Sequence, residues 1–186
     1  QRLKIIIITD NGTYGFDEKF TRGLNFIASI DNTCGKSSVL EAIYYCLGFE
    51  EIIGGQTEKV LTPVYKSNIK DEEKEYAVLQ SSMLLQISNG HDIITIMRSA
   101  KMENRKSKLI TVFYSPLENI YDKDTDKDDM YVHSSNSAQH EKGFHTFLEK
   151  FLGMSLPIVA TTDSIDRKLY LQLIFSGMFI EQKRGW

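Results

Sequence analysis

Four consecutive residues, Gly35, Lys36, Ser37 and Ser38, carry the side chains in this sequence that are best suited to binding phosphate. Lys36 supplies a positive charge for the β- and γ-phosphates of a nucleotide, and the Ser37 hydroxyl is suited to binding Mg²⁺. Gly35 lets the backbone approach a ligand where a Cβ atom would intrude. Ser38 would add a hydrogen bond to the α-phosphate. This order of residue types predicts a site for ATP and Mg²⁺.

These residues need a strand before them and a helix after them, and the sequence predicts both. Residues 24–30 form an apolar run of strand length, and residues 36–47 show apolar positions at helical spacing before Gly48. The N–H groups without intrahelical partners at a helix start, together with the helix dipole, favour a bound anion. We therefore predict a P-loop in which further nucleotide contacts come from Asn32, Thr33 and Cys34.

One position departs from the P-loop pattern G-x-x-x-x-G-K-[ST]. The first glycine would stand at position 30, where this chain has Ile30. A β-branched residue costs about 1–2 kcal/mol in a left-handed conformation, so the start of the loop must differ from the usual geometry. Two alternatives stay open: an ordinary helix start capped by serines, and a scaffold module with a degenerate nucleotide site.

The amino-acid composition limits the classes of protein to which this chain can belong. With 186 residues and 41% hydrophobic content, the chain can bury one sizeable core, which predicts a single compact domain. Its 22 basic and 25 acidic residues give a net charge of -3, which does not by itself favour nucleic acid as a partner. Cys34 and Cys46 have no metal-ligand spacing and fit a reducing cytoplasm. No leader and no apolar tract of membrane-spanning length occur, so we expect a cytoplasmic protein without a membrane partner.

The remaining residues predict an α/β fold with an antiparallel meander. We expect strands at 3–9, 16–21, 76–88, 92–98, 109–114 and 156–160, and helices at 36–47 and 138–152. The segment 50–68 is expected to be irregular with a short helical turn, 70–75 and 122–129 to be solvated, and 168–175 to be apolar and of either type. On the first helix, the predicted buried face consists of Val39, Leu40, Ile43 and Leu47.

Two further groups of side chains have a structural and a functional interpretation. Tyr14 or Phe16 would lie near an adenine ring, although aromatic residues at hairpins more often belong to the core. A basic cluster follows the second strand of the meander, and it fits either a solvated hairpin tip or a DNA-phosphate contact. The members of this cluster are Lys101, Arg105, Lys106 and Lys108.

A second motif lies near the end of the chain, where an apolar segment ends in Gln182. A strand ending in glutamine downstream of a P-loop resembles the Q-loop of ABC-type ATPases. The 146 residues that separate Lys36 from Gln182 resemble the spacing in SMC-type, RecN-type and RecF-type heads rather than in membrane transporters. Residues 179–186, with 25–27 and 31–33, are similar to a prokaryotic SMC-like subgroup that includes the ATPase subunits of Lamassu-type anti-phage and anti-plasmid systems.

This resemblance implies that the chain is the N-terminal half of an ATPase head, an excerpt of a longer polypeptide. It implies Lys36 and Gln182 as catalytic residues, with Ser37 and Gln182 at Mg²⁺. A long coiled coil and a C-terminal lobe with the signature motif and Walker B acid would follow. ATP hydrolysis would require a second head, most simply in a homodimer, so the fragment alone would be inactive. DNA and accessory or effector subunits are the implied partners.

Competing classes of nucleotide protein are separable by sequence features. A transporter-associated ATPase would need a shorter spacing between the P-loop and the glutamine. A GTPase would need an Asn-Lys-x-Asp motif, which the sequence lacks. We therefore expect the fold of an ABC-type head lobe, with an antiparallel meander beside a nucleotide-binding strand, loop and helix.

Overall fold

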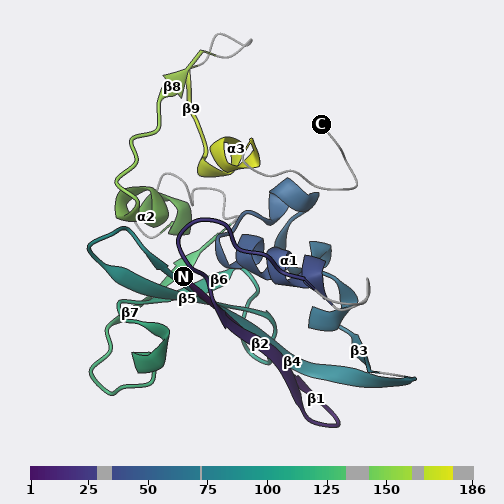
Figure 1. Cartoon of the computed structure of the whole chain (residues 1–186). Helices are drawn as coiled ribbons and strands as arrows, with labels where there is room; N and C mark the ends of the chain where they lie inside the picture. The colour runs from purple at the N-terminus through teal and green to yellow at the C-terminus, as the bar shows by residue number, and fades with distance from the viewer. Residues whose placement is uncertain (29–34, 72, 133–142, 161–165, 178–186) are drawn as a thin grey trace.

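The computed structural model describes residues 1–28, 35–71, 73–132, 143–160 and 166–177. Its main sheet has seven strands in the order β2-β1-β4-β5-β6-β7, with β3 paired to β4 off this path. Every pairing between these strands is antiparallel. The three α-helices lie on one side of this sheet (Figure 1), so the protein is a mixed α/β structure.

The first hairpin joins β1 (Arg2–Thr9) to β2 (Thr13–Lys19). Its turn is closed by the Thr9 N–H, which donates to the Gly12 carbonyl at 2.8 Å. Alternate residues of β1 point into the main core, where Leu3, Ile5 and Ile7 are buried. The strand predicted at residues 3–9 is therefore confirmed, and its side chains alternate between the two faces of the sheet as in any strand.

The meander consists of four antiparallel strands, of which the sequence predicted the first three. They are β4 (Lys74–Ser88), β5 (Ile93–Lys101), β6 (Leu109–Phe113) and β7 (Lys127–Tyr131). The described residues of 70–75 are exposed, so the prediction that this segment is solvated is confirmed. The segment 122–129 is also mostly exposed, but its last three residues form the start of β7, which was not predicted. Residues 70 and 71 belong to β3 (Asn68–Asp71), which pairs with the start of β4, because charged side chains can stay exposed while their backbone groups pair.

Helix α1 (Lys36–Cys46) starts and ends where the sequence predicts, and its predicted face is confirmed in part. Val39 is buried, Ile43 and Leu47 are partly buried against the core, and Leu40 is 42% exposed. The residues that α1 buries fully are Val39, Ala42, Tyr44, Tyr45 and Cys46. The prediction counted aliphatic residues alone and therefore missed the small and aromatic side chains that the helix also buries.

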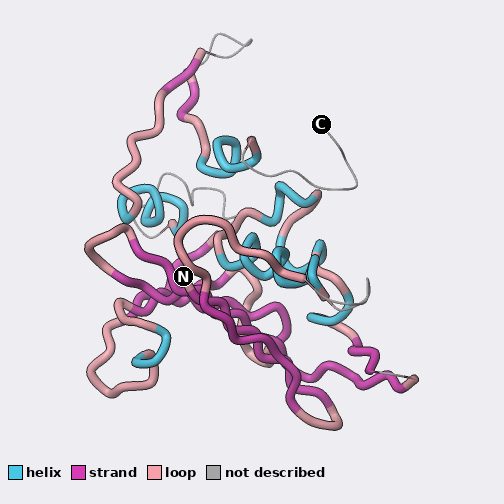
Figure 2. Tube along the Cα trace, in the orientation of Figure 1, coloured by secondary structure: helices cyan, strands magenta, loops and turns pink. Residues whose placement is uncertain are grey.

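The end of α1 forms a Schellman motif around Gly48. The Gly48 N–H donates to the Tyr45 carbonyl and the Phe49 N–H donates to the Tyr44 carbonyl, while Gly48 has φ 69°. Three short 3₁₀ helices follow, η1 (Glu50–Ile53), η2 (Thr57–Val60) and η3 (Pro63–Tyr65). The predicted irregular connection is thus confirmed (Figure 2).

The C-terminal part adds two helices and a small two-stranded sheet. Helix α2 (Phe144–Phe151) falls within the predicted helix 138–152, whose residues 138–142 lie outside the described residues. Strands β8 (Ile158–Val159) and β9 (Arg167–Lys168) pair, and α3 (Leu171–Ser176) follows. The rings of Phe49 and Phe175 lie 5.1 Å apart, so α3 packs at the C-terminal end of α1.

Candidate nucleotide-binding site

The candidate site is the N-terminal end of α1. Lys36 is the first residue of the helix, and Gly35 before it has φ 72° and ψ 14°, a left-handed conformation in which a residue with a Cβ atom is strained. The Gly35 carbonyl accepts the first intrahelical hydrogen bond, from the Val39 N–H at 3.1 Å. The first-turn N–H groups and the positive end of the helix dipole therefore lie at this end of α1, as anion binding requires.

Helix α1 is fixed at this end by residues of the η2–η3 connection. The hydroxyls of Ser38 and Thr62 lie 3.2 Å apart, and the Tyr65 hydroxyl donates to the Ser38 carbonyl at 2.7 Å. The Thr62 N–H donates to the Glu41 carboxylate at 2.9 Å, and burial raises the pKa of this carboxyl. Ser38 therefore already has a hydroxyl neighbour, whereas Ser37 is exposed.

The strand predicted before the loop is not formed in residues 24–28, and that prediction was wrong for these residues. They carry no strand hydrogen bonds within the described part of the chain, and Asn25 instead bonds to the backbone of Thr21 and Gly23. A strand requires a neighbouring backbone to pair with, which apolar composition cannot supply. The predicted contacts at Asn32, Thr33 and Cys34, and position 30, lie outside the described residues.

The segment that leads into the loop exposes apolar side chains. Leu24 is 78% exposed, Phe26 is 82% exposed and Ile27 is 39% exposed. Leu40, one turn beyond Lys36 on α1, is a further exposed aliphatic residue. Exposed apolar residues that are this large and this close in sequence indicate a contact surface.

Gln182 also lies outside the described residues. The Gln172 amide donates to the Gly48 carbonyl at 3.3 Å, which places α3 at the C-terminal end of α1.

A buried ion pair at the other end of α1 was not predicted from the sequence. Arg98 of β5 and Glu50 of η1 are both fully buried, with Nη2 and Oε1 2.7 Å apart. Arg98 also donates to the carbonyls of Tyr45 and Ser107, each at 2.7 Å, and its Cζ atom lies 3.8 Å from the centre of the Tyr45 ring. The sequence feature that could have indicated this ion pair is an arginine, Arg98, within an otherwise apolar strand sequence.

This ion pair joins β5 to η1. Arg98 also connects β5 to the last turn of α1 through the Tyr45 carbonyl and to the turn before β6 through the Ser107 carbonyl. Removing one partner of a buried pair typically costs about 3–5 kcal/mol, because the other charge stays buried without compensation. The pair therefore helps to fix the orientation of α1 on the sheet.

The other side chains considered from the sequence make contacts within the fold. The Tyr14 hydroxyl donates to Asp71 at 3.2 Å, and its ring stacks on Tyr76. In the basic cluster, Lys101 donates to the Val78 carbonyl at 2.6 Å, and Arg105 is half-buried with a hydrogen bond to Thr111. Neither Lys101 nor Arg105 is therefore directed at solvent alone.

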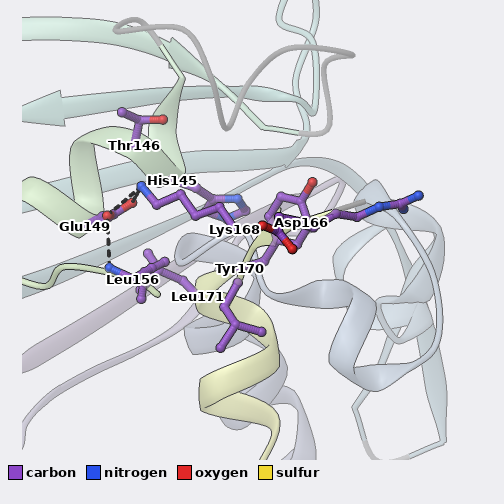
Figure 3. Close-up of a pocket in the computed structure, with 10 residues that line it drawn as sticks. His145, Thr146, Glu149, Leu156, Asp166, Lys168, Tyr170 and Leu171 are labelled. Atoms are coloured by element: carbon purple, nitrogen blue, oxygen red, sulfur yellow. Dashed lines mark hydrogen bonds and ion pairs between the residues drawn. The ribbon is translucent and has the colours of Figure 1, made fainter. Parts of the chain in front are cut away.

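A separate pocket of about 410 Å³ lies between α2 and β9 (Figure 3). Its charged lining includes Glu149 and Lys168, which form an ion pair at 2.7 Å. His145, which also lines it, has Nε2 3.2 Å from the Leu47 carbonyl. The pocket is thus at the C-terminal end of α1, away from Lys36.

Comparison with known proteins identified no matching family model, no similar curated protein and no similar solved structure. Among the described residues, no group of three or more His, Cys, Asp or Glu side chains is arranged to hold a metal ion. No helix in the described ranges is long and apolar enough to cross a membrane. Any functional assignment therefore has to be argued from the residues of this chain.

Proposed function

We propose that this chain is the N-terminal lobe of an SMC-like, ABC-type ATPase head that binds ATP with Mg²⁺. The observation that carries the proposal is the start of α1, where a left-handed Gly35 leads directly into Lys36 and Ser37 at the first turn of a helix packed on the sheet. Lys36 would hold the β- and γ-phosphates, and Ser37 would ligate Mg²⁺. Gln182 would join Mg²⁺ and orient the attacking water.

The exposed apolar segment 24–28 supports a role as one lobe of a larger head. In the proposed head, a strand of the C-terminal lobe pairs with this segment and covers Leu24 and Phe26. The same lobe would supply the Walker B acidic residue. Phosphoryl transfer depends on positioning and charge stabilisation, so half of a site binds nucleotide but does not turn it over.

In the complete protein, ATP held between the P-loop of one head and the signature motif of a second head would drive head engagement. A coiled coil would transmit this change to DNA in repair, chromosome maintenance or anti-phage and anti-plasmid defence. The resemblance of residues 179–186 to Lamassu-type ATPase subunits favours the defence role. Accessory or effector subunits would then respond to the engaged state.

Calorimetric titration of this chain with ATP and Mg²⁺ tests the proposal. The wild-type chain is expected to release heat on binding, and Lys36→Ala is expected to lower the affinity at least about tenfold, because a charge-assisted contact to phosphate is lost. Lys70→Ala, an exposed lysine on β3, is the matched control and should bind as the wild type does. In the complete protein, Lys36→Ala should abolish ATP-dependent head dimerisation.

Two results would contradict these assignments. Equal ATP affinity in the wild type and Lys36→Ala would exclude Lys36 as the phosphate ligand. No heat of binding in either this chain or the complete protein would instead favour a scaffold module with a degenerate nucleotide site, the alternative that Ile30 supports.

A further inference from the structure

Three polar side chains from two separate segments form a chain of hydrogen-bonding groups near the Lys36 end of α1. The Ser38 hydroxyl lies 3.2 Å from the Thr62 hydroxyl. The Glu41 carboxylate accepts the Thr62 N–H at 2.9 Å, and the Thr62 side chain is a second hydrogen-bond partner of the same carboxylate. We call Ser38, Thr62 and Glu41 the hydroxyl relay. It begins at the residue expected to bond to the α-phosphate and ends at a half-buried carboxyl group.

The Thr62 hydroxyl is directed at α1 rather than at the helix that follows it. Thr62 stands directly before Pro63, the first residue of η3, where a threonine often caps the helix. Its side chain makes no cap hydrogen bond here. Instead it contacts Ser38, 24 residues earlier in the chain. This hydroxyl is therefore placed to link Ser38 to Glu41.

The spacing of the hydroxyl relay is fixed by a buried tyrosine of η3. The Tyr65 hydroxyl donates to the Ser38 carbonyl at 2.7 Å, and the Tyr65 carbonyl accepts the Ser81 hydroxyl of β4 at 2.6 Å. Tyr65 is 1% exposed. The η3 segment is thus held between α1 and the sheet, which keeps Thr62 against Ser38.

An ionised Glu41 sets the direction of the hydrogen bonds in the relay. A carboxylate only accepts hydrogen bonds, so it takes the single proton of the Thr62 hydroxyl. The Thr62 oxygen then offers only lone pairs, and the Ser38 hydroxyl has to donate to it. In this state the Ser38 proton is committed to Thr62 and is not available to a phosphate oxygen, which is also an acceptor.

A protonated Glu41 reverses these bonds. The carboxyl proton is donated to the Thr62 oxygen, the Thr62 proton to the Ser38 oxygen, and the Ser38 proton to the phosphate. The other carboxyl oxygen still accepts the Thr62 N–H. One proton from the solvent enters at Glu41, and each hydroxyl keeps one proton throughout.

We propose that binding of ATP at Ser38 is coupled, through the Thr62 hydroxyl, to the uptake of one proton by Glu41. Thr62 is thus a positioning residue that acts on the nucleotide through Ser38. The inference rests on the proposed function for its ligand, and it adds a regulation of that site by pH.

The groups around Glu41 are compatible with either protonation state. Burial is the largest effect on this carboxyl and raises its pKa, whereas the bonds from Thr62 and the charge of Lys66, which follows η3, lower it. The other titratable group that faces it is the Tyr65 hydroxyl, whose pKa is raised by burial, so that it stays neutral and keeps its bond to the Ser38 carbonyl.

Calorimetric titration of this chain with ATP and Mg²⁺, in two buffers of different ionisation enthalpy, measures the protons taken up. The wild type should take up close to one proton per ATP more than Thr62→Val, which keeps the backbone N–H and the side-chain shape but lacks the hydroxyl. Thr62→Ser keeps the hydroxyl and is the matched control, with the uptake of the wild type. Protons exchanged by ATP itself are common to all variants and cancel in these differences.

The dependence of affinity on pH gives a second measurement. Where Glu41 is ionised before binding and protonated after it, the affinity of the wild type should fall about tenfold per pH unit, because one proton is taken up. The amide of Glu41→Gln can donate to Thr62 as the protonated carboxyl does. This variant should therefore lack that fall in affinity and bind ATP more tightly than the wild type at the high end of the range.

The outcomes separate the relay from the proposed function. Equal proton uptake in the wild type and Thr62→Val would overturn the relay, because the charge of the nucleotide alone would then protonate Glu41. Urea unfolding shows whether Thr62→Val is folded, and Ser38→Ala, which removes the other hydroxyl, should lose the same uptake. ATP binding without proton uptake in the wild type would overturn the relay alone, whereas no ATP binding in the wild type would overturn both proposals.

Discussion

At the scale of single residues, Glu41 shows how burial next to the candidate site affects a charge. Its carboxylate accepts the Thr62 N–H, yet burial outweighs this bond and raises the pKa of the carboxyl. A raised pKa means that ionisation is harder in the folded state than in the unfolded state. The contribution of Glu41 to stability is therefore complete below its unfolded pKa and is lost as the pH rises through its folded pKa.

Glu41→Gln keeps an acceptor for Thr62 and removes this ionisation. Relative to the wild type, the variant should gain unfolding free energy as the pH is raised from about 4 to 8, since only the wild type loses stability over this window. Urea unfolding at both pH values measures the difference. Glu103→Gln, at an exposed residue, is the control for the change from a carboxylate to an amide. A difference in unfolding free energy between Glu41→Gln and the wild type that does not change with pH would contradict the assignment.

At the scale of elements, the ends of α1 and α2 use the same motif in different surroundings. Gly48 and Gly153 follow these helices with φ 69° and 64°. A Cβ atom on Gly48 would lie 2.7 Å from both His145 Nε2 and Val132 Cγ1, whereas one on Gly153 would have no heavy atom within 4 Å. The end of α1 thus packs closely against His145 and Val132, whereas the end of α2 forms a turn with open space beside Gly153.

Gly153→Ala should destabilise the protein by about 1–2 kcal/mol, which is the cost of the left-handed conformation alone. Gly48→Ala carries the same cost and adds overpacking of about 1–3 kcal/mol. Thermal and urea unfolding of both variants measure the difference. Equal destabilisation would mean that His145 and Val132 move aside without cost, and that α1 is not held by this contact.

At the scale of the whole molecule, the proposal of a two-lobed head makes a prediction about the surface around residues 24–28. Phe26 is 82% exposed, and Tyr121, in the turn before β7, is 81% exposed. Neither side chain contributes much buried area, so neither should matter for the stability of this chain. Only Phe26 lies where the proposed C-terminal lobe would pack.

Phe26→Ser and Tyr121→Ser should each change the unfolding free energy of this chain by less than about 0.5 kcal/mol. In the complete protein, Phe26→Ser should weaken ATP-dependent head dimerisation, while Tyr121→Ser should not. Chemical crosslinking with and without ATP measures this difference. Identical behaviour of the two variants in the complete protein would remove the support that the exposed segment gives to a two-lobed head.

Local signals in the sequence were enough to predict many elements. The turn at Gly12, the start of α1 at Lys36 and its end at Gly48 are set by residues within a few positions of each other. The first three strands of the meander follow from apolar runs between turns, whereas β7, with the sequence KDDMY, was not predicted. The residue types at positions 35–38 also suffice to predict a phosphate-binding sequence. Phosphate binding by these residues stays a prediction.

The tertiary structure decided what depends on distant parts of the chain. The buried face of α1 is set by the sheet on which it packs, and the Glu50–Arg98 pair joins residues 48 positions apart. In residues 24–28, the described part of the strand predicted at 24–30, the backbone pairs with no other strand, so apolar composition did not make these residues a strand. Spacing in a sequence fixes periodicity and turns, but pairing, burial and charge compensation are interactions between segments, which only the folded chain brings together.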